Sequence, residues 1–206
     1  MSDPVLALAP GKVRPGDEHA PARLSHLALV THDAAATTEF YTTTMRMQLV
    51  AAVMHEQVPS TGERMPYLHI FFRMQDGSTI AFFEAPDLPQ PAPVTHPAYD
   101  VFNHIALEVP TRDEVDEWHR RLKDHGVDVL GPVDHTIIYS IYFYDPNGIR
   151  LEITTPLVAD WNDRPKQARA AVDAWLRTKE EALASGDDPS AALHRLIAAT
   201  EPSIFD

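Results

Sequence analysis

The feature that most constrains the fold of this 206-residue chain is an internal repeat. The segment HLALV at 26–30 returns as HIALEV at 104–109, so that a histidine opens each copy. Each copy also closes on a glutamate, which is Glu84 in IAFFEAP and Glu152 in IRLEITTP. Repeats of this length predict paired modules that share one core, because a module of this size is too small to be secure alone.

The two copies predict the same order of elements, namely one strand, one helix and three further strands. The first copy predicts a strand at 24–30, a helix at 34–45, and strands near 48–57, 66–74 and 78–85. The second copy predicts a strand at 102–109, a helix at 112–125, and strands near 127–131, 136–144 and 149–155. We therefore expect an α+β fold built from two β-α-β-β-β modules.

Composition defines five segments along the chain. They are an N-terminal arm with four prolines (1–22), a first module (23–86), a proline-rich linker (87–100), a second module (101–156) and a helical C-terminal extension (157–206). In the extension, apolar residues fall at helical spacing from Ala168 onward, and a second short helix is expected around 189–199. Since amphipathic stripes are usually buried, we expect these helices to pack on the modules or across a dimer.

Charge and composition exclude several classes of function. A formal net charge of −13 argues against binding to nucleic acid and against docking to an anionic membrane, since both need a basic surface. The chain has no cysteine, which excludes disulfides and thiolate metal ligands, and no apolar run approaches the ~20 residues of a membrane span. The N-terminus lacks a signal-peptide pattern, so a cytoplasmic enzyme or binding protein is expected.

The repeated histidines and glutamates form a candidate set of metal ligands. Strand alternation places His26 and His104 on the face opposite to their apolar neighbours, and Glu152 alternates in the same way with Leu151 and Ile153. A single histidine or glutamate on a strand is more often hydrogen-bonded or solvated than metal-bound. Together, however, two histidines and one carboxylate are a ligand set known for Fe(II). Glu84 is a further candidate.

The segment HTIIYSIYFYDPNGIRLEITTP at 135–156 predicts a β-hairpin. Asp-Pro-Asn-Gly at 145–148 supplies the turn, because proline presets one dihedral angle and Asn-Gly tolerates positive φ. The hairpin therefore carries His135, Tyr142 and Glu152 on or near two adjacent strands.

On these modules and candidate ligands, residues 24–156 resemble the vicinal oxygen chelate superfamily, which includes glyoxalases, fosfomycin-resistance proteins and extradiol ring-cleaving dioxygenases. The resemblance implies a cupped eight-stranded mixed sheet around a metal, with His26 on the first strand, His104 on the fifth and Glu152 on the eighth. In the dioxygenases the corresponding three residues hold iron, whereas glyoxalases have a fourth ligand where Glu84 falls. One departure is TTTMRM at 42–47, where many members of the superfamily have Leu-Gly.

The hairpin also resembles the pattern of type I extradiol dioxygenases. The matching residues are VDH (133–135), five residues, IY (141–142), two residues, DPNG (145–148), three residues and Glu152. The resemblance implies an Fe(II)-dependent enzyme that cleaves a catecholic aromatic substrate with O2, in which His135 and Tyr142 supply protons or hydrogen bonds to substrate oxygens. The fosfomycin-resistance proteins share the Tyr-Phe-x-Asp-Pro part of the pattern but have no histidine in place of His135.

Two other functions stay open at this point. One is a glyoxalase-type isomerase or lyase that uses Ni, Co, Zn or Mn, with Glu84 as fourth ligand and as base. The other is a non-enzymatic protein that sequesters a drug or metabolite. In each case the partner is a small molecule, and family resemblance favours a homodimer.

Further aromatic and histidine side chains are candidates for a pocket wall. His69 shares a strand face with Phe71 and Arg73, so either a pocket role or cross-strand packing fits its position. Phe82, Tyr139 and Tyr144 are candidates for an aromatic wall that accepts a planar substrate, although aromatic strand residues are first of all core residues.

Overall fold

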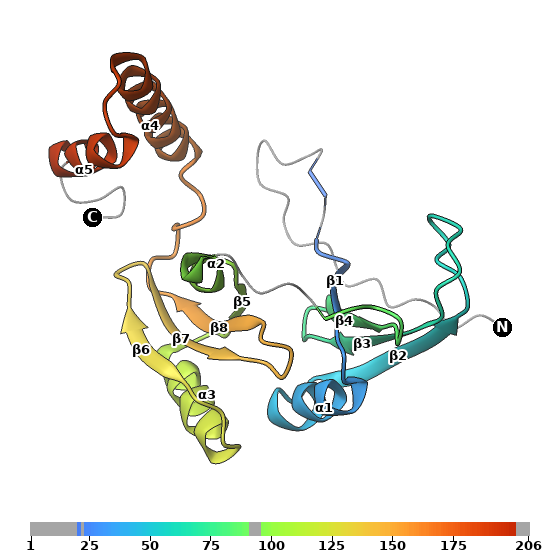
Figure 1. The fold of residues 1–206 in the computed structure, drawn as a ribbon. Coiled ribbons are helices and arrows are strands. Elements are labelled where there is room, and N and C mark those ends of the chain that lie inside the picture. Colours follow the sequence, from blue (N-terminus) through green and yellow to red (C-terminus); the bar gives the residue numbers. More distant parts are fainter. Residues whose placement is uncertain (1–19, 22, 91–95, 201–206) are drawn as a thin grey trace. The chain divides into compact units, whose positions relative to one another are not determined.

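The computed structural model describes residues 20–21, 23–90 and 96–200 of the chain (Figure 1). The arm expected at 1–22 therefore lies almost entirely outside the described residues, as does part of the linker. The described residues confirm the α+β class and the repeated order of elements, and their strands pair as two four-stranded sheets. No helix in this part of the chain is long and apolar enough to cross a membrane.

The first sheet is mixed, and its strand order is β1-β4-β3-β2. Its elements are β1 (His26–Val30), helix α1 (Ala34–Glu39), the π-helical turn η1 (Phe40–Thr44), β2 (Gln48–His55), β3 (Tyr67–Arg73) and β4 (Thr79–Glu84). Strands β1 and β4 pair in parallel, with His26 opposite Thr79, and the other neighbours pair antiparallel.

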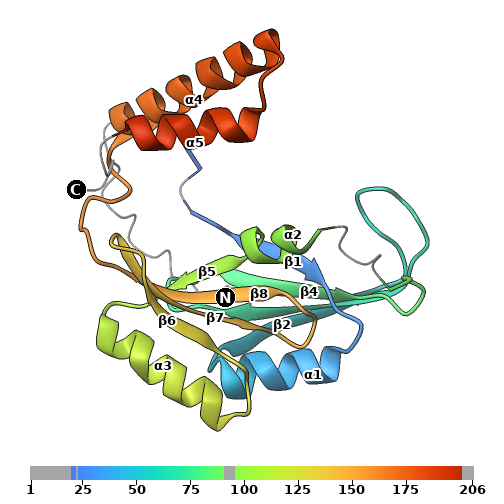
Figure 2. The same ribbon diagram turned by 60° about the vertical axis from the view of Figure 1, so that its left-hand side comes forward.

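One face of this sheet is core. Its buried side chains include Phe72 and Phe82, and the ring of Tyr41 lies 5.1 Å from each of them, measured between centroids. Tyr41 belongs to η1, which continues α1, so this helical segment covers the core face (Figure 2). The side chain of Asp33 caps α1 by accepting a hydrogen bond from the N–H of Ala36.

The end of this helical segment explains the departure at 42–47. The helix predicted at 34–45 forms as α1 and η1, which together end at Thr44, and Arg46 then has φ of 57°. This left-handed conformation is the one that glycine adopts without steric cost. Arg46 therefore takes the backbone geometry that the Leu-Gly sequence of related chains favours.

The second sheet repeats the order of the first, as β5-β8-β7-β6. Its module contains helix α2 (Pro97–Phe102), β5 (Ile105–Glu108), helix α3 (Arg112–Asp124), β6 (Leu130–Asp134), β7 (Ile138–Tyr144) and β8 (Arg150–Pro156). The turn between β7 and β8 forms as predicted, since the Gly148 N–H donates to the Asp145 carbonyl oxygen at 3.0 Å and Gly148 has φ of 75°.

Two boundaries differ from the prediction for identifiable local reasons. Helix α2 occupies residues expected to lie in the linker and the start of a strand, because Pro97 fits the first helical turn and the ring of His96 caps it. Strand β6 begins at Leu130 instead of 127, because the N–H of Val127 donates to the carbonyl oxygen of Leu122 and closes the end of α3.

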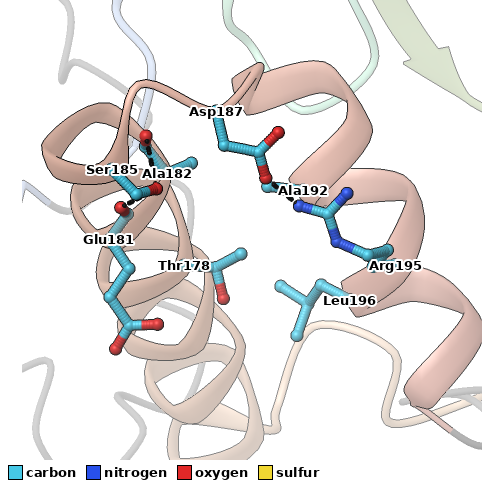
Figure 3. A pocket seen from close by; sticks show the side chains of 8 residues that line it. All are labelled: Thr178, Glu181, Ala182, Ser185, Asp187, Ala192, Arg195 and Leu196. Carbon is cyan, nitrogen blue, oxygen red and sulfur yellow. Dashed lines mark hydrogen bonds and ion pairs between the residues drawn. The ribbon is translucent and has the colours of Figure 1, made fainter.

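The predicted tail helices are present as α4 (Pro165–Ser185) and α5 (Pro189–Ala199). Gly186, with φ of 73°, ends α4, and the Asp188 side chain caps α5. A hollow of about 370 Å³ lies between the two helices (Figure 3). Its lining includes Thr178, Glu181 and an ion pair between Arg195 and Asp187, and none of the predicted site residues.

Candidate functional site

Counting from the turn glycines shows which residues of the two modules correspond. Gly77 and Gly148 both have positive φ and precede β4 and β8, and both strands continue with one half-buried and three buried residues. The fourth residue after Gly148 is Glu152, and the fourth after Gly77 is Ala81. The first module therefore has alanine where the second has its glutamate, and Glu84 lies three positions further along.

Glu84 faces the core side of the first sheet. Glu84 lies two residues after Phe82 on β4, and side chains two residues apart on a strand point to the same face. Phe82 faces the core, so Glu84 does too. Its Oε1 accepts a hydrogen bond of 3.0 Å from the N–H of Ala34, the first residue of α1. Glu84 thus satisfies an otherwise unpaired N–H of this helix and lies on the opposite face of the sheet from His26.

His26 opens β1 on the other face of the first sheet. Its ring lies 5.9 Å from that of Phe71 and 6.5 Å from that of His69, measured between centroids. Its Nδ1 lies 3.2 Å from the hydroxyl oxygen of Ser25. The side chain is exposed.

His104 lies next to Tyr142, with the two rings in an edge-to-face arrangement at 5.9 Å. The Nδ1 atom of His104 is 3.1 Å from the carbonyl oxygen of Phe102. A carbonyl oxygen can only accept, so Nδ1 carries the proton and Nε2 is the nitrogen with the lone pair. This tautomer is the one that suits metal binding through Nε2.

Tyr142 also contacts a cation. The guanidinium of Arg150 lies over its ring at 4.5 Å from the centroid and donates to the carbonyl oxygen of Val101 at 2.7 Å. On the same strand as Arg150, Glu152 is only 2% exposed. Burial of a carboxylate is costly unless it is paired or bound to a cation, which makes Glu152 an unusual residue for a strand of this apolarity.

His135 lies in a short ordered loop between β6 and β7. Its N–H donates to the Ile138 carbonyl oxygen at 2.9 Å, and the next residue, Thr136, has φ of 73°. The Thr136 N–H donates to Asp134, which lowers the pKa of that carboxyl group, and the guanidinium of Arg112 acts in the same direction. The side chain of His135 is exposed.

The structure does not group the predicted ligands. Among the residues that it describes, no three histidine, aspartate or glutamate side chains lie close enough together to hold a metal ion. It does bring His26 close to His69, and His104 close to Tyr142. The ligand set of His26, His104 and Glu152 therefore stays a prediction.

The three residues expected to form an aromatic wall lie in different surroundings. Phe82 is fully buried in the core, the Tyr139 hydroxyl donates to Asp116 on α3, and Tyr144 is largely exposed. The pairing of β3 with β4 instead places Tyr67, His69, Phe71 and Phe83 on one face, opposite α1. We call these four residues the aromatic face.

His69 is the most buried member of the aromatic face. Its ring stacks on Phe83 at 3.5 Å and contacts Phe71 at 4.1 Å. Its Nε2 atom is buried and has no hydrogen-bond partner within the described part of the chain. Burial lowers the pKa of His69 below its usual range, and the nearby His26 acts in the same direction. The alternation in YLHIFF placed His69 and Phe71 on the same face of one strand. Only the structure shows that Phe83 on β4 lies beside them.

Comparison with known proteins identifies relatives of several functions. Biphenyl-2,3-diol 1,2-dioxygenase 3 of Rhodococcus globerulus is 27% identical over 133 residues, which are 64% of this chain and 62% of that protein. A glyoxylase/bleomycin resistance protein/dioxygenase domain from Frankia sp. EAN1pec has the same fold, with a TM-score of 0.53 and 16% identity over 65% of this chain and 97% of that one.

A fosfomycin resistance protein of Listeria monocytogenes is 25% identical, with a TM-score of 0.47, over 66% of this chain and 94% of that one. The family model described as the Glyoxalase/Bleomycin resistance protein/Dioxygenase superfamily matches residues 23–153, which cover both modules. The chain therefore belongs to the glyoxalase/bleomycin resistance/dioxygenase superfamily, the vicinal oxygen chelate proteins.

Proposed function

We propose that this protein is an Fe(II)-dependent extradiol-type dioxygenase that cleaves a catecholic aromatic compound with O2. The observation that carries the proposal is the contact between His104 and Tyr142, because it joins a proposed ligand to a residue of the dioxygenase pattern. The tautomer of His104 supports a ligand role. The likeness to a protein named as a biphenyl-diol dioxygenase supports the reaction class, although the match spans 62% of that protein's length.

In this proposal His26, His104 and Glu152 would hold the iron. The donor set fits Fe(II), since it combines two imidazoles with one carboxylate and leaves positions for the diol and O2. Glu84 is not included, because it lies on the core face and holds the first N–H of α1. Bound iron would provide the path by which electrons pass from the diol to O2, and both oxygen atoms enter the ring-opened product.

The chain's own residues would manage protons and orientation. His135 would accept and donate protons at the hydroxyl oxygens of the catechol, since an imidazole ring has nitrogens for both roles. The Tyr142 hydroxyl would hold a substrate oxygen by a hydrogen bond. Arg150, stacked on the Tyr142 ring, restricts the orientation of that ring.

The glyoxalase-type alternative loses its distinguishing feature. It requires Glu84 as fourth ligand and base, whereas Glu84 and His26 lie on opposite faces of the first sheet. The residue that corresponds to Glu152 in the first module is Ala81, which has no donor atom. We therefore propose a three-ligand site.

Metal analysis and oxygen uptake together test the proposal. Protein purified without oxygen should contain iron, and Fe(II)-loaded protein should consume one O2 for each catechol cleaved in a panel of substituted catechols. A preparation that binds Ni, Co or Zn and turns over a thiohemiacetal would support a glyoxalase instead. Protein that binds no metal under any loading condition would point to a sequestering protein.

A further inference from the structure

The aromatic face is apolar beyond its rings. The row of paired residues through His69 runs from Val53 on β2 to Phe83 on β4 and Val30 on β1. Val53 is 41% exposed and Val30 is 45% exposed. The face therefore offers exposed aliphatic side chains on either side of a stacked pair of rings.

The adjacent row contains small residues. Phe71 pairs with Ala81, and Ala81 pairs with Ala28, so two alanines lie side by side next to the Phe71 ring. In the second module the position of Ala81 is occupied by Glu152, and the positions of His69 and Phe71 by Ser140 and Tyr142. At these positions the first module therefore lacks the hydroxyl of Tyr142 and the carboxylate of Glu152, and it has an imidazole in place of the Ser140 hydroxyl.

His69 adds a buried polar atom to this face. The Nε2 of His69 is buried and has no hydrogen-bond partner within the described part of the chain, while its ring is held by Phe71 and Phe83. A buried polar atom without a partner is unfavourable, and such atoms in native structures are commonly satisfied by a ligand or an ordered water. Stacking against Phe71 and Phe83 restricts the orientation of the His69 ring, and therefore of its Nε2 atom.

We propose that the aromatic face binds the ring of a planar aromatic ligand, and that His69 Nε2 forms a hydrogen bond with a hydroxyl group on that ring. The inference rests on the proposed function in that the ligand would be the substrate, and it makes His69 a positioning residue. The occupant is a small aromatic compound because the hydrogen-bonding site is a single buried atom flanked by rings, which a flat hydroxylated ring can satisfy.

Metal-free protein tests this inference separately from the dioxygenase reaction. The probes are 2-naphthol, which has one hydroxyl and cannot chelate as a diol, and naphthalene, which has none; fluorescence titration measures both dissociation constants. The wild type should bind 2-naphthol about 3–10-fold more tightly than naphthalene, the ratio expected for one net hydrogen bond. Absence of binding, or equal affinity for the two probes, would overturn the inference.

Variants separate the hydrogen bond from packing. His69→Phe should keep naphthalene binding and lose the preference for 2-naphthol, whereas His69→Gln, which retains a hydrogen-bonding group, should keep part of that preference. Phe71→Ala should weaken the binding of both probes. An unchanged preference in His69→Phe would show that His69 does not contact the hydroxyl.

His119 provides the matched control, because its Nε2 is likewise buried without a partner among the described residues but lies on α3. His119→Phe should leave both affinities unchanged. Because no iron is present in these titrations, a protein that fails to consume oxygen can still bind 2-naphthol through His69. Conversely, if His69→Phe keeps both its rate of oxygen uptake and its preference for 2-naphthol, the inference is rejected and the proposed function still stands.

Discussion

At the scale of single residues, three side chains carry the proposed iron site. Replacing His26, His104 or Glu152 by alanine should each remove most bound iron from a folded protein. The loss should exceed the 10–100-fold weakening typical of changes beyond the direct ligands. Iron content after anaerobic loading and desalting measures it, with His125→Ala, an exposed histidine at the end of α3, as the control. Stoichiometric iron in all three variants would reject the site.

Glu84 is expected to behave differently from those three residues. Glu84→Ala should retain iron but lower the free energy of unfolding by about 1 kcal/mol, because the Ala34 N–H at the start of α1 loses its acceptor. Urea denaturation of metal-free protein gives the free energy, and iron analysis gives the metal content. A Glu84 variant with normal stability and no iron would restore the four-ligand alternative.

His135 is expected to serve the reaction and not the metal. His135→Ala should keep its iron and lower kcat by ~10²–10⁴-fold, the usual contribution of a positioned acid or base. Tyr142→Phe should lower it less, since only one hydrogen bond is removed. Oxygen uptake with iron analysis of the same samples measures both effects. Wild-type rates in His135→Ala would remove the most specific support for a dioxygenase.

At the scale of elements, the β7–β8 turn is bonded to the first module. Asp145 accepts a hydrogen bond of 3.1 Å from the Tyr41 hydroxyl, and the Thr31 hydroxyl donates to Asn147 at 2.7 Å. Asp145 also accepts from the N–H groups of Asn147 and Ile149 within the turn. The DPNG sequence therefore has a structural role in addition to shaping the hairpin that carries Tyr142 and Glu152.

Tyr41 gives this connection a pH dependence. Burial raises the pKa of Tyr41 well above its ordinary value of about 10, and Asp145 adds to the shift. The folded state therefore keeps a proton that the unfolded state loses above pH ~10, so this contribution to stability falls as pH rises beyond that value.

Tyr41→Phe should be less stable than the wild type by about 1–2 kcal/mol at pH 8, because the hydrogen bond to Asp145 is lost. The difference should shrink as pH rises above ~10, since only the wild type carries the titrating phenol. Urea denaturation at pH 8, 9.5 and 10.5 measures the trend, with Tyr144→Phe, on an exposed tyrosine, as the control. A difference that grows with pH would contradict the assignment.

At the scale of the whole molecule, the two modules share a fold but differ in surface chemistry. The first carries His69, Phe71 and Ala81 where the second carries Ser140, Tyr142 and Glu152. In the proposed enzyme, this division would assign the apolar part of the substrate to the first module and the polar chemistry mainly to the second. His26 would be the contribution of the first module to the metal.

We also expect a homodimer, as family resemblance implies. Analytical ultracentrifugation over a range of protein concentrations should give a mass near twice that of the chain. A protein that stays monomeric at all concentrations and still binds stoichiometric iron would show that one chain completes the site alone.

The sequence by itself determined the repeat, the order of its strands and helices, and the β7–β8 turn, because these depend on short-range periodicity and on residues with restricted φ and ψ. The fold class followed from the same signals. The positions of His26 at the start of β1 and Glu152 in β8 also followed, since alternation along one strand is local, whereas His104 lies one residue before β5, which begins at Ile105.

Only the tertiary structure decided which residues share a face across strands. The correspondence of Glu152 with Ala81 depends on where the turns at Gly77 and Gly148 begin their strands, and a shift of one residue moves every side chain to the other face. For the same reason Glu84 faces α1, and the aromatic face contains Phe71 and Phe83 in place of Phe82. Pairing register is set by packing between distant segments, which no single stretch of sequence contains.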